Sequence, residues 1–489
     1  MASEGLTVAL EMRVLAWLAH QDCEAYLVGG SVRDWLLGRP IYDLDFAVAG
    51  DGLELARRLA DRFSGDYYAL DRTRGTGRAI LYREGDQALI VDVAGLRGPS
   101  LVADLADRDF TINSLAFDVR QPGEVIDHHD GLADLKAGVI RAVSDDSIRN
   151  DPLRALRAFR QSSQLGFHLH PATNALIRRD GADLAHVSGE RVRDEVSRLL
   201  ALPMVSTSLS QMDDLGLLTI VLPEMEPLRG LAQSPPHELD GMAHSLETVR
   251  RLEGLLAEPA ATTDCGDGIP SGLSPFAENL RVHLGQIMSD TRPRLVSLKL
   301  AALLHDCGKP QMRSVDDDGR IRFIGHESAG AKIGAEALHR LRFSRNEVQL
   351  VETVVRNHMR PLLLAEQESV SSRAVYRFFR DTGDAGVEVL LLALGDHLAT
   401  SGCDHGDKVW YRLLSLTCRM FGDYWERRAE RVVPPTLVSG HDLLGEFGLE
   451  PGPHLGALLE TVREAQVSGQ VHTREEALAL IRAELSGQS

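Results

Sequence analysis

The 489-residue sequence has few cysteines and no long apolar segment. The five cysteines are scattered and form no Cys-x-x-Cys pair, which excludes a zinc knuckle and fits a reducing compartment. No apolar run is long enough to span a bilayer. The N-terminus carries Glu4 and Glu11 and lacks the basic flank and apolar core of a signal peptide. We therefore predict a cytoplasmic protein with no membrane partner.

Positive charge is also scarce. The net charge of -18 argues against a protein that coats nucleic acid without specificity, although a local basic patch can still bind an RNA. The hydrophobic fraction of 44% is typical of soluble proteins, and the length allows about three domains.

The most informative stretch, residues 27–48, reads LVGGSVRDWLLGRPIYDLDFAV. An apolar lead runs into Gly29, Gly30 and Ser31, and a short helical pattern follows, so we predict a strand, a tight turn and a helix. The N–H groups of the turn and of the helix N-terminus form a site for phosphate oxygens, to which Ser31 adds a hydroxyl.

Two carboxylates follow this predicted phosphate site. Asp43 and Asp45 alternate with apolar residues in the period of two that is typical of a strand, so both point to one face. Hard oxygen ligands beside a phosphate site are what Mg²⁺-dependent nucleotidyl transfer requires. An ordinary turn and a solvated strand edge explain either piece alone, but both within one short segment favour the catalytic interpretation.

These motifs, GGSVRDWLLG followed by DLDF, resemble the signature of the class II tRNA nucleotidyltransferases and bacterial poly(A) polymerases, which belong to the polymerase β-like superfamily. The resemblance implies that Asp43 and Asp45 bind Mg²⁺, and that the turn and Arg33 hold a nucleoside triphosphate. In a second interpretation, Arg33 and Asp34 only tie the turn to its helix.

The chain after the carboxylates predicts a helix at 52–63 and short strands at 67–70, 78–82 and 88–93. Asp92 falls at the end of the last strand. Relatives of the poly(A) type have an acidic residue at a similar place, where a third carboxylate would complete the metal site. The alternative is that Asp92 is only a turn former.

Residues 104–118, DLADRDFTINSLAFD, resemble the RRDFTINA motif of the family. The resemblance implies that Arg108 binds triphosphate oxygens, and that Asp109 and Asn113 belong to the nucleotide site. Asp107 stands where many relatives have a first arginine, so any duty of that arginine is in doubt here.

The connection from Asp92 to Asp109 is short. CCA-adding relatives of this class usually carry a longer flexible loop here, which is associated with addition of the terminal A, and enzymes that add only CC lack it. The sequence therefore suggests that this chain makes only part of the CCA end. Residues 125–143 resemble the closing strands of the same head, and the adjacent His128 and His129 indicate a turn rather than a metal pair.

The segment IRNDPLRALRAF predicts a helix with Pro152 at its first position and Asp151 as its N-cap. Asp151 and Arg154 share a face at the helix end, and Arg157 continues that face. In the family, an acidic residue and an arginine with this spacing pair with the edge of the incoming CTP or ATP, so that the protein acts as its own template. Capping and base selection are compatible roles for Asp151.

Residues 171–200 read as helical, and GERVRDEVSRLL resembles the R-V-x-x-E element of the family, which we interpret as a brace for the nucleotide-reading helix. Positive charge for a tRNA acceptor stem is supplied by Arg178, Arg179, Arg191, Arg193 and Arg198. A solvated helical face is the competing interpretation.

A second constellation occupies the C-terminal half, beyond a Pro- and Gly-rich boundary at 225–236. Histidine and aspartate recur there in the order H, HD, H, H, D, which resembles the HD phosphohydrolases. The resemblance implies one or two divalent transition metals, with these ligands: His244, His305, Asp306, His326, His358 and Asp396. A metal-bound hydroxide would attack a phosphoester, and Lys309 is placed to meet a phosphate oxygen. The alternative is an HD fold kept as a helical scaffold.

We therefore predict an α+β protein, with a polymerase β-like head on a small mixed sheet, a mostly helical neck and body, an all-α HD domain and a helical tail. The predicted domains are the catalytic head (1–143), the neck and body for nucleotide selection and RNA binding (144–225), the HD domain (226–425) with a flexible insertion (257–275), and the tail (437–489).

The predicted function is template-independent addition of all or part of CCA to the 3′ end of tRNA from CTP and ATP, with Mg²⁺ in the head and a phosphohydrolase in the HD domain. Two other enzymes fit the motifs less well. A poly(A) polymerase would share every head motif, and an HD phosphohydrolase would use its head only to sense nucleotide. The intact Asp43 and Asp45 pair counts against the latter. The sequence leaves the oligomeric state open.

Overall fold

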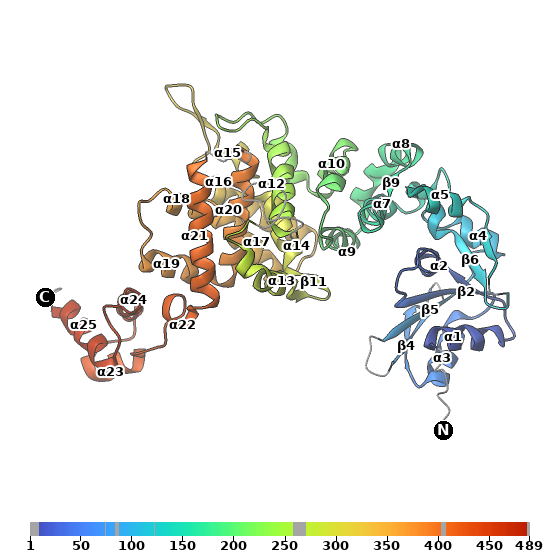
Figure 1. Cartoon of the computed structure of the whole chain (residues 1–489), viewed down its shortest axis with the longest axis horizontal. Helices are drawn as coiled ribbons and strands as arrows, with labels where there is room; N and C mark the ends of the chain where they lie inside the picture. The colour runs from blue at the N-terminus through green and yellow to red at the C-terminus, as the bar shows by residue number, and fades with distance from the viewer. Residues whose placement is uncertain are drawn as a thin grey trace. The chain divides into compact units, whose positions relative to one another are not determined.

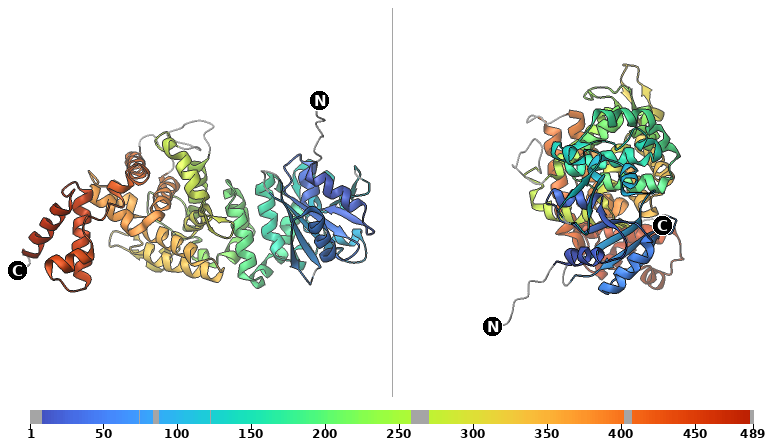
Figure 2. Two further views of the ribbon diagram at one scale, coloured as in Figure 1. Left: turned by 90° about the horizontal axis from the view of Figure 1, so that it is seen from below. Right: turned by 90° about the vertical axis from the view of Figure 1, so that its right-hand side faces the viewer.

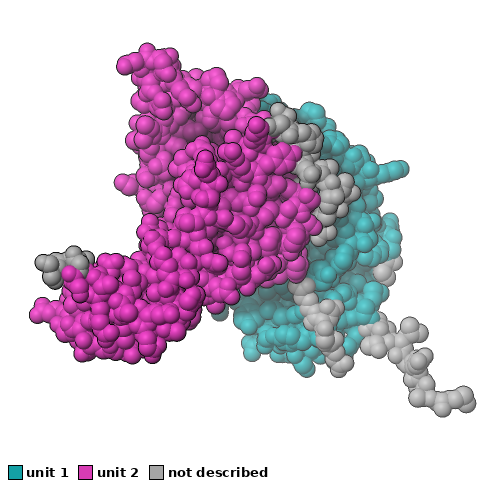
Figure 3. Space-filling view, turned by 60° about the vertical axis from the view of Figure 1, so that its left-hand side comes forward, with its two compact units in different colours: residues 1–188, 214–217 teal, residues 189–213, 218–489 magenta. Residues whose placement is uncertain are grey.

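The computed structural model describes residues 9–73, 75–83, 88–121, 123–257, 270–401 and 407–486. The chain divides into two compact units, which are coloured separately in Figure 3. The first comprises residues 1–188 and 214–217, and the second comprises residues 189–213 and 218–489. Each unit has its own core.

The first unit is built on a seven-stranded mixed sheet in the order β3-β4-β5-β2-β1-β6-β7. Its strands are β1 (Ala25–Val28), β2 (Asp43–Val48), β3 (Asp66–Asp71), β4 (Thr76–Leu81), β5 (Leu89–Gly95), β6 (Leu115–Asp118) and β7 (Val125–Asp127). Only β2 and β5 run parallel, and the other neighbouring strands are antiparallel. The parallel register places Asp45 directly beside Asp92.

Helix α3 (Gly52–Phe63) covers one face of this sheet (Figure 1). Asp51 begins the helix as its N-cap, and the buried face of the helix packs on the strands. Gly77 of β4 permits the close approach, because a Cβ there would lie 2.6 Å from the Cβ of Ala56. Strand residues that alternate with those under α3 therefore project from the opposite face, which carries Asp43 and Asp45.

Further helices and one small strand pair complete the first unit. The helical segments are α1 (Leu10–Ala19), α2 (Gly30–Leu36), α4 (Leu101–Ala106), η1 (Thr111–Asn113), α5 (Gly131–Ala137), α6 (Ser147–Asn150), α7 (Leu153–Leu165), α8 (Pro171–Asp180) and η2 (Gly181–His186). The parallel pair is β8 (Val139–Ile140) with β9 (His168–Leu169).

The structure confirms the predicted helix at 52–63 and the three strands after it, with two corrections. Asp92 is an interior residue of β5, which continues to Gly95, so the turn-former interpretation is wrong. Of the closing strands predicted at 125–143, only β7 joins the sheet. Helix α5 follows β7 and takes the chain away from it, so that β8 pairs with β9 instead.

Helix α7 begins at Leu153, so the prediction that Pro152 occupies its first position is wrong by one residue. Pro152 instead precedes the helix, where its fixed φ still suits the helical path. Pro152 therefore occupies the N-cap position predicted for Asp151, although Oδ1 of Asp151 still accepts a hydrogen bond from the Leu153 N–H at 3.3 Å.

The second unit is mainly helical in the part of the chain that the structure describes. Its helices up to the tail are α9 (Gly189–Leu200), α10 (Ser206–Asp214), α11 (Leu218–Val221), η3 (Pro223–Leu228), α12 (Gly241–Leu256), η4 (Ser274–Phe276), α13 (Ala277–Gly285), α14 (Arg294–Leu304), α15 (Lys309–Met312), α16 (His326–Arg340), α17 (Arg345–Asn357), α18 (Arg360–Ala365), α19 (Ser372–Thr382), η5 (Gly383–Ala385), α20 (Gly386–Ser401), α21 (Lys408–Trp425) and α22 (Arg428–Arg431). Two short hairpins pair β10 (Ile287–Ser289) with β11 (Arg292–Pro293), and β12 (Ser314–Val315) with β13 (Ile321–Arg322).

Helix α14 is the centre of this bundle. Its sequence RLVSLKLAALL is apolar around most of its circumference, which is typical of a helix buried on all sides, and every one of its residues except its first leucine is buried. Helices α12, α16, α17 and α20 pack against it (Figures 1 and 2). The apolar core therefore fixes the helices that carry the HD residues.

The C-terminal tail forms three helices, α23 (Gly440–Phe447), α24 (Pro453–Val467) and α25 (Arg474–Ser486), as the sequence predicts. They share a small core of their own, with Leu443, Val462 and Ile481 buried together. An ion pair between Arg377 of α19 and Glu464 of α24, 2.5 Å between Nε and Oε1, joins the tail to the HD helices.

Most of the predicted flexible insertion, residues 258–269, lies outside the described residues. Its last part, after residue 270, forms the turn that leads into η4. Among the helices of the described ranges, none is both long and apolar enough to cross a membrane.

Candidate active sites

The predicted phosphate site has the strand, turn and helix that its sequence implies. Strand β1 ends before Gly29, and α2 begins at Gly30. Gly29 has a φ of 74°, and a Cβ there would lie 2.8 Å from Nη1 of Arg108. Only glycine fits, because the backbone conformation and the arginine both exclude a side chain. The Arg108 guanidinium therefore lies against the turn, where it can meet an anion.

Ser31 ties this turn to the carboxylate strand. Its Oγ donates a hydrogen bond to the carbonyl of Asp43 and accepts one from the N–H of Asp45, each at 3.0 Å. The hydroxyl that the sequence assigned to phosphate binding is therefore used within the protein. Its effect is to fix Asp43 and Asp45 beside the turn.

The three predicted carboxylates lie on one face of adjacent strands. Asp45 and Asp92 are direct neighbours in the parallel pair, and Asp43 is two residues from Asp45 on β2. Burial, together with the charge of Asp92, raises the pKa of Asp45 to about 6, although Arg108 opposes the shift. Burial and Asp92 also raise the pKa of Asp43. Crowded carboxylates of this kind fit a divalent cation, because its charge would offset their mutual repulsion.

Arg78 holds the third carboxylate. It lies directly opposite Asp92 in the β4–β5 register, and both distances, Nε to Oδ1 and Nη2 to Oδ2, are 2.8 Å. A fork of this kind fixes the plane of the carboxylate while leaving lone pairs on the far side of each oxygen. The sequence analysis did not single out Arg78, since the cross-strand register is visible only in the sheet.

Arg33 is buried, and the structure favours the interpretation that it holds the turn to its helix. Its Nε and Nη2 contact both carboxylate oxygens of Asp34, at 2.9 and 2.8 Å, and its Nη1 donates to Oδ1 of Asn113 at 2.8 Å. With all three nitrogens engaged, Arg33 connects α2 to η1 and orients the groups around the phosphate site.

A buried hydrogen-bond network links helix α7 to these groups. The amide of Asn113 donates to Oδ1 of Asp109 and to Oε1 of Gln161, both at 2.9 Å. Nη2 of Arg157 lies 2.8 Å from Oδ2 of Asp109. Asp109 is fully buried, yet Arg157 and the hydrogen bond from Asn113 lower its pKa, so its charge is retained. The predicted residues Asp109, Asn113 and Arg157 are thus brought together.

Gln161 is the member of this network that the sequence analysis missed. It is buried, accepts from Asn113, and lies 3.5 Å from Nη1 of Arg33 and 3.4 Å from Oδ2 of Asp109. Its position was visible in principle, because it follows Arg157 by four residues and so continues the helix face already singled out.

Arg154 holds the loop that presents Arg108. Its guanidinium is buried and donates to the carbonyl oxygens of Asp107 at 2.6 Å and Arg108 at 3.2 Å, and to Oγ of Ser147 at 3.1 Å. The side chain of Asp107, where relatives have an arginine, is half exposed and lies 3.9 Å from Arg154. The structure therefore places the base-selecting candidates of α7 next to the triphosphate candidates.

The predicted turn at His128 and His129 is confirmed. Oδ1 of Asp127 accepts hydrogen bonds from the N–H groups of His129 and Gly131, at 3.1 and 2.9 Å, and the two histidines lie in the bend that begins α5. They belong to no metal-compatible group among the described residues.

Several of the arginines predicted to meet the acceptor stem are paired with acidic neighbours. Arg179 pairs with Asp180 at 2.7 Å, and Arg198 lies 3.3 Å from Glu195. Arg193 pairs with its own neighbour, Asp194, and donates to the carbonyl of residue 342 at 2.6 Å. Helix α9, the predicted brace, packs on α14 within the second unit. Its bracing role and the RNA contacts of these arginines stay predictions.

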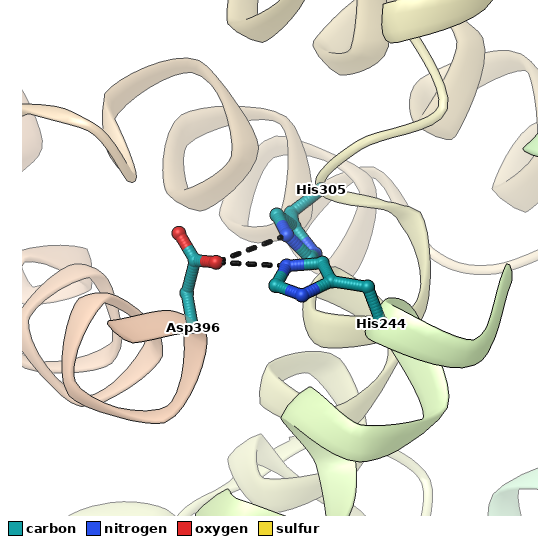
Figure 4. A group of neighbouring side chains, drawn as sticks. All are labelled: His244, His305 and Asp396. Carbon is teal, nitrogen blue, oxygen red and sulfur yellow. Dashed lines mark hydrogen bonds and ion pairs between the residues drawn. The ribbon is translucent and has the colours of Figure 1, made fainter. Parts of the chain in front are cut away.

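The HD residues converge from five helical regions of the second unit. Donor atoms of His244, His305 and Asp396 lie within 4.8 Å of one another (Figure 4). Those of His305, Asp306 and His358 do so as well. Oδ1 of Asp396 is 2.9 Å from Nε2 of His244 and 3.7 Å from Nε2 of His305. All of the predicted ligands in this set are therefore neighbours in space.

His326 completes the cluster from the first residue of α16. Its Nε2 lies 3.3 Å from Nε2 of His358 and 3.5 Å from Oδ1 of Asp306. Two imidazole nitrogens that face one another with a carboxylate oxygen nearby have the donor chemistry of a transition-metal site.

Three of these imidazoles are oriented by backbone carbonyls. Nδ1 of His305, His326 and His358 each lies 2.7 to 2.9 Å from the carbonyl three residues earlier in the chain. A carbonyl only accepts, so Nδ1 carries the proton and Nε2 faces the cluster, which is the arrangement that metal-binding histidines usually have.

The charges in the cluster also fit a cation. Burial opposes the charged form of His305, but Asp306 and Asp396 raise its pKa to about 10. Burial, together with the neighbouring His305 and His326, lowers the pKa of His358 to about 3, so it is a neutral ligand. The two carboxylates thus stabilise a positive charge at a place where a divalent metal would replace the proton of His305.

Lys309, predicted to meet a phosphate oxygen, lies at the edge of the cluster. Its Nζ is 2.6 Å from Oδ2 of Asp306 and 2.6 Å from Oε1 of Gln233. His237 also lies here, with its ring centroid 5.4 Å from that of His244. Gln233 lies in the Pro-rich boundary segment and His237 directly follows it, and no periodicity there indicated that they approach the site.

Known protein families match the parts of the chain that contain the two candidate sites. Four family models match this chain. They are the Poly A polymerase head domain (25–141), the RNA- and SrmB-binding site of polymerase A (166–228), the HD domain (243–400) and tRNA nucleotidyltransferase domain 2 (435–481). The head sheet with its carboxylates and the HD cluster each fall within the corresponding match. The chain is therefore a nucleotidyltransferase enzyme that also carries an HD domain.

Curated relatives match over almost the whole length. The A-adding tRNA nucleotidyltransferase of Deinococcus radiodurans is 32% identical over 464 residues, which cover 94% of this chain and 95% of that protein. The CC-adding tRNA nucleotidyltransferase of Thermus thermophilus is also 32% identical, over 476 residues, with 95% and 96% covered. This chain belongs to the tRNA nucleotidyltransferase family, and its poly(A) polymerase alternative is not favoured.

Solved structures share the fold. A CCA-adding enzyme in complex with CTP aligns with a TM-score of 0.66 at 21% identity, covering 98% of this chain and 96% of that one. A Thermotoga maritima CCA-adding enzyme complexed with tRNA aligns with a TM-score of 0.61 at 21% identity, covering 97% and 95%. The α+β architecture predicted from the sequence is thus confirmed.

Proposed function

We propose that this chain transfers nucleotides from CTP and ATP to the 3′ end of tRNA and makes all or part of the CCA sequence. The observation that carries the proposal is the placement of Asp43, Asp45 and Asp92 on one sheet face, beside a glycine turn that Arg108 contacts. Full-length relatives that act on tRNA, and similar folds solved with tRNA and CTP, support this substrate class.

The residues take the following roles. Asp43 and Asp45 hold Mg²⁺, with Asp92 as the third carboxylate. When bound, the metal neutralises the triphosphate and lowers the pKa of the attacking hydroxyl. Gly29, Gly30 and Arg108 form the phosphate site, because Arg108 Nη1 lies against the turn at Gly29 and helix α2 begins at Gly30.

Base selection belongs to the start of helix α7. Asp151 and Arg154 offer acceptor and donor groups for a Watson–Crick edge. The network of Asp109, Asn113 and Arg157 holds this helix against the phosphate site, so selection and catalysis are rigidly connected. On this basis we assign catalysis to the head (1–143) and nucleotide selection with RNA binding to the neck and body (144–225).

We further propose that the chain makes only part of the CCA end. The connection between β5 and α4 consists of residues 96–100 alone, so no long loop is inserted at this point. The A-adding and CC-adding relatives, which match over nearly their whole lengths, support a partial product.

The test uses tRNA transcripts that end before CCA, after C, and after CC. Purified protein with Mg²⁺ receives CTP and ATP separately and together, and the products are sized. A stop after CC, or addition of A only to the CC-ended transcript, is expected. Completion of CCA from every start would contradict partial addition, and no incorporation on any tRNA would refute the transferase proposal. Equal extension of unstructured RNA would favour a poly(A) polymerase.

The HD cluster supports a second activity, metal-dependent phosphoester hydrolysis. Imidazole and carboxylate ligands suit one or two divalent transition metals, which would supply a bound hydroxide. Lys309 would meet a phosphate oxygen. Hydrolysis of bis(p-nitrophenyl) phosphate with Mn²⁺, Co²⁺ or Ni²⁺ should be lost in Asp306→Ala while CTP incorporation is retained. If the wild-type protein does not hydrolyse bis(p-nitrophenyl) phosphate with any of these metals, the HD fold is a scaffold.

A further inference from the structure

A row of side chains crosses the head sheet on the face that carries the carboxylates. Tyr68 of β3 lies opposite Arg78 of β4, Arg78 lies opposite Asp92 of β5, and Asp92 lies beside Asp45 of β2. Residues that pair directly across strands project from the same face. Tyr68 therefore belongs to the surface of the carboxylates, whereas α3 covers the opposite face.

This surface ends in exposed apolar side chains at the edge strand. Tyr68 is 54% exposed, Leu70 on the same strand is 51% exposed, and Tyr82, which follows β4, is 63% exposed. The Tyr82 hydroxyl bonds to the carboxylate of Asp66 on β3. Single exposed apolar residues are common, but three that adjoin on one sheet face form a surface on which another molecule can bind. We call Tyr68, Leu70 and Tyr82 the β3 surface.

The order of the strands decides from which side an acceptor approaches. The glycine turn and Arg108 lie at the end of β1, on one side of Asp45, and Asp92 lies on β5, on the other side. In phosphoryl and nucleotidyl transfer the attacking and leaving oxygens are roughly in line. A triphosphate held at the turn therefore directs its leaving group toward β1, and the attacking hydroxyl must come from the β5 side.

The acceptor molecule that carries this hydroxyl then continues over β4 and β3. Neighbouring strands lie about 4.8 Å apart, so Tyr68 is two strand spacings, about 10 Å, from Asp92. That separation suits the nucleotides just upstream of the reacting end. Arg78, which lies between them, is already paired with Asp92, so an aromatic face rather than a free cation is available for binding here.

We propose that the β3 surface binds the single-stranded 3′ end of the acceptor RNA, with a base stacked on the ring of Tyr68. This inference rests on the proposed function, since it requires an RNA hydroxyl as the attacking group. Stacking on an aromatic ring tolerates different bases, because every base presents a π face. Such a platform suits an acceptor whose last bases change as nucleotides are added.

The test compares Tyr68→Phe with Tyr68→Leu. Phenylalanine keeps the aromatic stacking face, whereas leucine keeps the apolar bulk but lacks the aromatic face. An exposed position tolerates both residues. We expect Tyr68→Leu to raise the KM for tRNA by roughly tenfold or more, given the usual strength of base stacking. The KM for CTP and the thermal midpoint should be unchanged, and Tyr68→Phe should match the wild type.

A direct measurement accompanies the kinetics. A hairpin RNA with a single-stranded 3′ overhang, carrying 5-iodocytidine at its penultimate position, is irradiated with each protein, and the cross-linked peptide is sequenced. A cross-link at Tyr68, together with weaker overhang binding by Tyr68→Leu, is expected whether or not nucleotides are incorporated.

Failure of this inference is distinct from failure of the proposed function. If the wild type incorporates nucleotides and Tyr68→Leu has the same KM for tRNA, the RNA platform is wrong. If the wild type incorporates no nucleotide, the RNA overhang can still be tested for binding. Equal binding of the overhang by the wild type and Tyr68→Leu would then also overturn the RNA platform. Loss of a dimer in Tyr68→Leu, without loss of RNA binding, would show instead that the surface contacts a second copy of the chain.

Discussion

The half-buried carboxylate Asp45 should make metal binding in the head depend on pH. Burial and Asp92 raise its pKa from 3.8 to about 6. A metal binds the ionised form, so affinity is present above pH 6 and is lost as the pH falls through 6. The ionised fraction of such a group drops from about 90% at pH 7 to about 10% at pH 5, and affinity should fall about tenfold. For an aspartate with an ordinary pKa, the metal affinity would change by less than about 10% over the same pH range.

The assay uses Mn²⁺ as a probe, with free Mn²⁺ measured by electron paramagnetic resonance at pH 7, 6 and 5. Nucleotide is left out, because its phosphates also titrate in this range. Asp45→Asn reports the Mn²⁺ that the HD cluster binds, so the difference between wild type and variant belongs to the head.

A second variant tests the cause of the raised pKa. Asp92→Asn removes the neighbouring negative charge that raises the pKa of Asp45, so the loss of Mn²⁺ binding should move to lower pH. Equal affinity at pH 5 and pH 7 in the wild type would refute the reasoning. An unchanged profile in Asp92→Asn would leave burial and the charge of Asp43 as the causes.

Three further predictions follow from the buried contacts. Gln161→Leu removes hydrogen-bonding partners of Asn113 and Arg33 and should lower kcat/KM for CTP by about 5- to 30-fold, corresponding to about 1–2 kcal/mol. The exposed Gln164→Leu on the same helix is the control, and equal kinetics of the two variants would contradict the network. Glu388→Ala leaves Arg294 buried without its partner and should lower the stability of the HD helices by about 3–5 kcal/mol in urea unfolding. The control is Glu278→Ala, at an exposed ion pair, which should leave the urea midpoint unchanged. Mn²⁺ at about 100 times its Kd should stabilise the HD helices by about 2.7 kcal/mol, and a chelator should remove this stabilisation. If Mn²⁺ raises the Tm of Asp306→Ala by the same amount, the metal binds elsewhere.

Much of the local structure was predictable because it depends on neighbours in the sequence. The alternation around Asp43 and Asp45 predicts β2, since a half-buried strand needs that period. The helix at 52–63 was predicted to the residue, because Asp51 caps its start and its apolar spacing matches a helical face. The family resemblance rested on the same local motifs, and it pointed to both candidate sites.

The sequence does not show where a side chain acts across elements. The hydroxyl of Ser31 and the guanidinium of Arg33 were assigned to the triphosphate, yet both make hydrogen bonds within the protein. Their sequence neighbours show a phosphate-binding turn but not which donors the fold already uses. Gln161 was missed for the same reason, because its partners lie 48 or more residues away in the chain.

The sequence by itself determined the residue types of both sites, the secondary structure that carries them and the family of the protein, because these depend on periodicity and short spacings. The tertiary structure alone decided which residues meet. It set the register that joins Tyr68, Arg78, Asp92 and Asp45 in one row, and it packed the helices that gather the HD ligands around one point. Strand order and helix packing follow from how the whole apolar core is buried, and no short stretch of sequence contains that information.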